Sequence, residues 1–107
     1  LYNTRPPLDP EAGLRTLINE EILFHFVAGE KKGMELLPGL AGARCPVLVL
    51  AGEQDPVCPL ADAQEIAAAL PPQWAQFVSF PGVGHGAWRD DPEAAYPLLR
   101  GFIAEAL

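Results

Sequence analysis

Two side chains, Asp55 and His85, have the types and the spacing for acid–base chemistry. Asp55 stands in a polar turn that follows the apolar run 47–51. His85 stands in the glycine-rich loop 81–86, which follows a second short run with apolar residues at three of its five positions, residues 76–80. A carboxylate that orients an imidazole and stabilises its charged form supplies two members of a nucleophile–base–acid triad.

Both apolar runs are predicted to be strands of one parallel sheet. Residues 47–51 are apolar without alternation, which is typical of a strand covered by helices on both faces. Residues 60–70 lie between the runs and carry an apolar stripe at helical spacing, including Ala63, Ile66 and Leu70. Parallel strands end at the same edge of a sheet, where α/β proteins place their ligand sites, so the acid and the imidazole are expected to meet there.

The segment 45–107 resembles the C-terminal part of the α/β-hydrolase fold, most closely the prolyl aminopeptidase-related branch. The resemblance is carried by PVLVLAGEQDPVCP, by the later FPGVGHGAW and by a closing helix. It implies an α/β fold class, with two parallel strands and flanking helices preceded by helices from a cap. Residues 1–44 would then be the end of the cap and a connector. By position, Asp55 matches the acid and His85 the base of a triad that transfers an acyl group to water.

No part of the sequence matches the G-x-S-x-G turn that carries the nucleophile in this family. Ser79 is the only serine, and we interpret it as structural because it lies inside the second predicted strand. We therefore expect the C-terminal fragment of a serine-type peptidase or esterase, inactive alone. The alternative is a non-catalytic interaction or regulatory piece that is stable only with a partner chain.

Three further residues are candidates for substrate binding. In the prolyl aminopeptidase branch, an acid on a cap helix binds the free α-amine of the substrate, and the resemblance implies Glu20 or Glu21 for this role. An ammonium group needs a nearby carboxylate in a partly desolvated pocket. The alternative is that both acids are solvated. Trp88 is expected to pack behind the histidine loop or to line the pocket, whereas Asp90 is expected to be solvated.

The ends of the chain predict helices. A helix over 9–28 has Asp9 as N-cap and an apolar face, and the prolines before it predict extended chain over residues 1–7. A shorter helical turn follows at 30–37. The closing helix begins near residue 91, and Pro97 predicts a kink there or a helix that begins only after it.

Charge and composition exclude several classes of partner. The net charge is −7 and the basic residues form no cluster, which argues against nucleic acid and anionic membrane surfaces. No apolar run approaches the ~18 residues of a membrane span. A two-stranded sheet is not a self-sufficient unit, so its exposed face is expected to be covered by a missing N-terminal half or another copy. The remaining expected partner is a small-molecule or peptide substrate.

The two cysteines, Cys45 and Cys58, flank the first predicted strand and its turn. An extended strand separates them too far for a disulfide, so two free thiols and a cytoplasmic location are predicted. The cysteines and histidines lack metal-ligand spacing along the chain, and we expect no metal and no cofactor.

Overall fold

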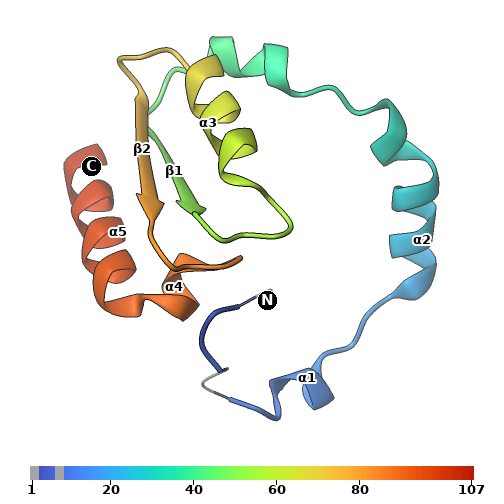
Figure 1. Ribbon diagram of the computed structural model, residues 1–107. Helices are drawn as coiled ribbons and strands as arrows, with labels where there is room; N and C mark the ends of the chain where they lie inside the picture. Colours follow the sequence, from blue (N-terminus) through green and yellow to red (C-terminus); the bar gives the residue numbers. More distant parts are fainter. Residues whose placement is uncertain (1–2, 7–8) are drawn as a thin grey trace.

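Two parallel strands form the centre of the C-terminal α/β unit, and a computed structural model describes residues 3–6 and 9–107 of the chain (Figure 1). β1 spans Val47–Gly52, β2 spans Ala75–Phe80, and the two pair in parallel. The helix α3, Leu60–Ala69, makes the crossover between them. The predicted strand–helix–strand unit and the α/β fold class are confirmed.

Helices cover both faces of this sheet. α3 lies on one face, and α5, Pro92–Ala106, lies on the other, as Figure 1 shows. The short helix α4, Ala87–Asp90, leads from β2 into α5. The α5 face holds the largest apolar cluster of the described residues, made of Phe80, Val83, Ala87 and Ala95 with Leu50, Val78 and Leu98 packed against them. The cluster includes Phe80, the last residue of β2, and Leu50, near the end of β1, so it packs close to the edge of the sheet where both strands end.

The closing helix starts where predicted and includes Pro97. The Asp91 side chain accepts a hydrogen bond from the Ala94 N–H at 3.3 Å, and a proline occupies the first helical position. Pro97 lies inside the helix, so a helix that begins only after this proline is wrong. Pro97 has no N–H to donate to the carbonyl four residues earlier in the helix. Because this part of the helix is exposed, water can bond that carbonyl instead.

The single helix predicted over 9–28 is wrong. The structure has two helices there, α1 over Ala12–Arg15 and α2 over Glu20–Ala28. The Thr16 hydroxyl donates to the Ala12 carbonyl at 2.9 Å as α1 ends, and the Asn19 side chain accepts from the Ile22 N–H at 3.0 Å as α2 begins. A polar side chain that bonds the local backbone competes with a continuous helix.

The connector from α2 to β1 consists of two 3₁₀ helices, η1 over Glu30–Gly33 and η2 over Leu37–Gly42. η1 falls within the helical turn predicted at 30–37, and η2 was not predicted. Of the extended stretch predicted at 1–7, only residues 3–6 are among the described residues. The division of the chain at residue 44 stays a prediction.

Most apolar side chains of α1 and α2 are exposed. Leu14 of α1 is 86% exposed and Phe24 of α2 is 75% exposed. α2 packs against η1, and Figure 1 shows it across the molecule from the strands. Among the described residues, none of the helices has the length and apolar character needed to cross a membrane.

Candidate active site

The turn after β1 and the loop after β2 are joined by backbone hydrogen bonds. The Glu53 N–H donates to the Phe80 carbonyl at 3.1 Å, and the Gln54 N–H donates to the Val83 carbonyl at 2.9 Å. These bonds continue the pairing of the two strands beyond the last residues of the sheet. The acid turn and the histidine loop are therefore positioned as one unit.

Gly52 allows the histidine loop to cross close above the end of β1. A Cβ atom at this position would lie 2.0 Å from the Gly84 carbonyl oxygen and 2.5 Å from the Val83 carbonyl oxygen. Gly82 turns the loop with a φ of +69°, in the left-handed region that glycine adopts readily. Both glycines are required by the path that brings His85 over the strand ends.

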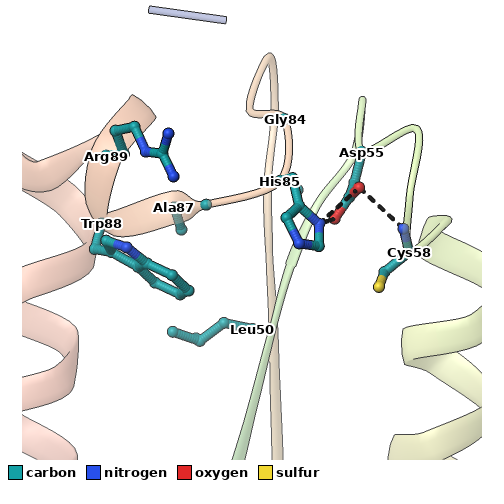
Figure 2. A pocket seen from close by; sticks show the side chains of 10 residues that line it. Leu50, Asp55, Cys58, Gly84, His85, Ala87, Trp88 and Arg89 are labelled. Atoms are coloured by element: carbon teal, nitrogen blue, oxygen red, sulfur yellow. Dashed lines mark hydrogen bonds and ion pairs between the residues drawn. The ribbon is translucent and has the colours of Figure 1, made fainter. Parts of the chain in front are cut away.

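Asp55 and His85 meet at this edge, as the sequence predicts. The His85 Nδ1 lies 2.9 Å from Oδ2 and 3.1 Å from Oδ1 of Asp55 (Figure 2). The Asp55 side chain is 8% exposed and the His85 side chain 29% exposed. With Nδ1 directed at the carboxylate, the second ring nitrogen of His85 is turned away from Asp55.

The Asp55 carboxylate is also held by its own turn. Its Oδ1 accepts hydrogen bonds from the Val57 N–H at 2.8 Å and the Cys58 N–H at 3.0 Å. Burial would raise the pKa of Asp55, but the N–H groups of Cys58 and Val57, together with His85, outweigh burial and lower this pKa below its ordinary value. The carboxylate therefore stays ionised at neutral pH and fixed in orientation.

A pocket of about 290 Å³ opens beside the pair. Its lining includes the apolar side chains of Leu50 and Trp88 and the thiol-bearing Cys58 (Figure 2). Trp88 thus lines the pocket, which is one of its two predicted placements. The pocket provides a partly apolar space in front of His85 in which a small group could bind.

Asp90 is a residue that the sequence interpretation placed wrongly. It was expected to be solvated, yet it is only 2% exposed. Its Oδ2 accepts hydrogen bonds from the Gly84 N–H at 2.9 Å, the Thr4 N–H at 2.8 Å and the Thr4 hydroxyl at 3.0 Å. Asp90 thereby anchors the residue directly before His85. Asp90 is the last residue of a four-residue helix. In the sequence, an acid in such a place looks the same whether it is buried as an anchor or solvated.

The structure does not bring the other candidates to this pocket. Glu20 and Glu21 lie in the first turn of α2, both exposed, and line a separate hollow of about 710 Å³ with Phe24 and neighbouring apolar residues. The Ser79 hydroxyl donates to Glu53 Oε1 at 2.8 Å. This bond gives Ser79 a contact within the sheet edge, in keeping with its interpretation as structural.

Several solved structures resemble this chain, whereas no curated protein matches it. A protein described as a non-heme bromoperoxidase, from Mycobacterium tuberculosis H37Rv, has a TM-score of 0.61 and 31% identity over 66% of this chain. A thermophilic esterase from Thermogutta terrifontis has a TM-score of 0.61 and 28% identity, also over 66% of this chain. An α/β fold family hydrolase from Bacillus anthracis str. Sterne shares the fold at a TM-score of 0.65 and 22% identity, over 79% of this chain.

The match covers only part of each neighbour. The chain spans 26%, 25% and 28% of the bromoperoxidase, esterase and Bacillus structures, about a quarter of their length. The sequence profile of the TAP-like protein family matches residues 30–106, which include both strands and the whole site. Together with the geometry at the strand ends, this match shows that the chain belongs to the TAP-like family of α/β-hydrolases.

Proposed function

We propose that this chain supplies the acid and the base of a serine-type hydrolase, with Asp55 as the acid and His85 as the base. The observation that carries the proposal is the contact between Asp55 and His85 Nδ1 at 2.9 Å, at the edge of a pocket. A buried carboxylate at this nitrogen fixes the imidazole tautomer and stabilises the imidazolium that forms during catalysis.

The chemistry follows from the two ring nitrogens. The neutral His85 ring donates its Nδ1 proton to Asp55, which leaves the second nitrogen, Nε2, as the basic one. This nitrogen takes the proton of an attacking serine hydroxyl and returns it to the leaving group, in an acyl transfer to water. The low pKa of Asp55 keeps its charge in place throughout the cycle.

The nucleophile of this reaction is proposed to come from a part of the α/β-hydrolase fold that these 107 residues do not include. The chain spans about a quarter of the solved neighbours, which have 31% and 28% identity to it. The sequence has no G-x-S-x-G turn, and its only serine bonds to Glu53. The same missing part is the proposed partner that covers the exposed apolar side chains of α1 and α2.

The proposed substrate class is a peptide with a free amine or a small ester. The esterase neighbour favours an ester. For a peptide, the proposed amine ligands are Glu20 and Glu21, which lie beside Phe24 on one helix and add negative charge to an apolar hollow. Glu21→Gln and Glu20→Gln would then raise KM for free-amine substrates and leave KM for N-acetylated substrates unchanged. An equal rise for both substrates would remove the amine-binding role.

Replacing Asp55 by asparagine in the complete hydrolase tests the central proposal. The asparagine side chain keeps an oxygen for the turn N–H groups but presents an amide to His85, which favours the wrong tautomer. We expect kcat to fall about 10⁴-fold, as in other triads. Asp62→Asn is the matched control, because Asp62 is an exposed acid in the first turn of α3. If the Asp55→Asn variant kept its activity, Asp55 would not be the triad acid.

The second candidate function is that of a non-catalytic interaction piece, and the exposure of α1 and α2 favours it. The two proposals differ in what happens when the chain is mixed with the nucleophile-bearing part of the hydrolase. If the first proposal is right, ester hydrolysis appears on mixing and is lost with His85→Ala. Binding without hydrolysis would support the interaction role instead.

A further inference from the structure

A third heteroatom donor, the thiol of Cys58, lies beside the Asp55–His85 pair. One ligand atom each of Asp55, Cys58 and His85 lies within 4.8 Å of the others. The cysteine comes from the acid turn and the histidine from the loop after β2, so sequence spacing gave no sign of this cluster. We propose that these three residues form a binding site for a divalent metal ion of the zinc class.

The donor set selects the metal. A thiolate sulfur, an imidazole nitrogen and a carboxylate oxygen are the three ligand types of protein zinc sites, whereas Mg²⁺ and Ca²⁺ take oxygen ligands. Three protein ligands leave the fourth tetrahedral position open to water. The 290 Å³ pocket, which the same three residues help to line, gives that position access to solvent.

The distances require small side-chain movements at all three residues. Zinc lies ~2.3 Å from sulfur and ~2.0–2.2 Å from nitrogen or oxygen, so tetrahedral ligand atoms lie roughly 3.3–3.8 Å apart. Asp55 Oδ2 and His85 Nδ1 lie 2.9 Å apart, so these two atoms must separate slightly to hold the ion between them. Cys58 is exposed, so its thiol is free to rotate inwards. The backbone of Cys58 is held in place meanwhile, because its N–H donates to Asp55 Oδ1 at 3.0 Å.

Metal binding at this site is incompatible with the proposed catalytic role of His85. A metal on Nδ1 removes the hydrogen bond to Asp55, and a metal on Nε2 occupies the basic lone pair. Either arrangement takes away the general base, so zinc would inhibit the hydrolase reversibly. This consequence rests on the proposed function, whereas metal binding itself does not.

The test is a titration of the chain with Co²⁺, which substitutes for zinc and reports its ligands by absorption. We expect one Co²⁺ per chain, with a thiolate-to-cobalt charge-transfer band that Zn²⁺ displaces. Cys58→Ser should abolish the band, and His85→Ala should weaken binding by more than about tenfold, the loss that even outer-shell partners cause. Cys58→Asp should restore binding, measured by calorimetry, without the band.

The chain contains a matched control for the cysteine and for the histidine ligand. Cys45 is its other cysteine and is also exposed, and His25 is its other histidine, on α2. Cys45→Ser and His25→Ala should bind Co²⁺ as the unmodified chain does, with circular dichroism as the check on folding. Absence of the band from the unmodified chain, or its persistence in Cys58→Ser, would overturn the metal site. Neither result bears on hydrolysis, which is assayed separately by Asp55→Asn.

Discussion

Both oxygens of the Asp55 carboxylate face His85 Nδ1, and one of them also accepts from the turn backbone. Oδ2 makes the shorter contact to His85 Nδ1, at 2.9 Å, and Oδ1 accepts from the Val57 and Cys58 N–H groups. Asp55 is therefore both a turn aspartate bonded to its own backbone and the partner of the histidine. A carboxylate has about four lone-pair sites, so one residue can shape its turn and orient an imidazole.

Asp90 is the second carboxylate on which the geometry of the site depends. The Asp90→Asn variant tests how much its charge contributes to stability. Asp90→Asn keeps the shape but replaces an ionised acceptor of three hydrogen bonds by a neutral amide. We expect the free energy of unfolding to fall by about 1–3 kcal/mol, the range for buried bonds to a charged group. Urea unfolding measures the change. Asp62→Asn, which alters an exposed acid, should stay within about 0.5 kcal/mol of the unmodified chain.

Asp90 should also make the free energy of unfolding depend on pH. Burial would raise the pKa of Asp90, but the bonds from Thr4 and Gly84 outweigh burial and lower it below the ordinary value of 3.8. The nearby charges of Arg5 and Glu93 pair with each other at 3.3 Å. Because the folded pKa is lowered, the stabilisation is present above pH 3.8 and disappears as the pH falls through the folded pKa. Stability should therefore fall less steeply below about pH 4 in Asp90→Asn than in the unmodified chain. Equal slopes would mean that Asp90 is not ionised in the fold.

At the scale of the elements, the strands and the crossover helix were predictable because their apolar patterns are local and continuous. The apolar run 47–51 predicts a buried strand, and β1 spans Val47–Gly52. The helix predicted over 9–28 failed for the opposite reason. Most of its apolar stripe is exposed in the structure, so the local bonds of Thr16 and Asn19 decide where helices begin and end. The anchor at Asp90 was also unpredictable, because it bonds across 86 residues to Thr4.

The crossing of the histidine loop over the end of β1 can be tested at its glycine. Gly52→Ala would place a Cβ 2.0 Å from one carbonyl oxygen and 2.5 Å from another, both in the backbone. The loop must move, and we expect a loss of about 1–3 kcal/mol or more in the free energy of unfolding. The His85 Nδ1 proton resonance, measured by NMR, should also change as the contact with Asp55 lengthens.

Gly101 provides the matched control for this substitution. It lies inside α5, and a Cβ there would have no neighbour within 4 Å. Gly101→Ala should stabilise the chain by about 0.5–1 kcal/mol, because alanine loses less backbone freedom in a helix. If both alanine substitutions stabilised the chain, the close approach at Gly52 would be absent in solution.

At the scale of the whole molecule, the chain divides its apolar side chains between two environments. Residues around the strand ends form a buried cluster, and those of α1 and α2 are exposed. The exposed group includes Leu14 of α1, Leu17 and Ile18 between the two helices, and Ile22, Leu23, Phe24 and Val27 of α2. An apolar surface of this extent is typical of an interaction site. We therefore expect α2 to contribute little to the stability of the chain alone and more to its association with a partner.

Substitutions at two phenylalanines can distinguish the contribution to stability from the contribution to association. Phe80 is 5% exposed in the main cluster, and Phe24 is 75% exposed on α2. Phe80→Ala should lower the free energy of unfolding by about 3–5 kcal/mol, because it leaves a cavity in the cluster. Phe24→Ala should change it by less than about 0.5 kcal/mol, as is usual for exposed sites. In a binding titration with the nucleophile-bearing part of the hydrolase, Phe24→Ala should weaken association by at least about tenfold, the loss of a buried aromatic anchor at an interface. Unchanged association would mean that the partner covers another surface, and a large loss of stability would mean that α2 packs on the sheet in solution.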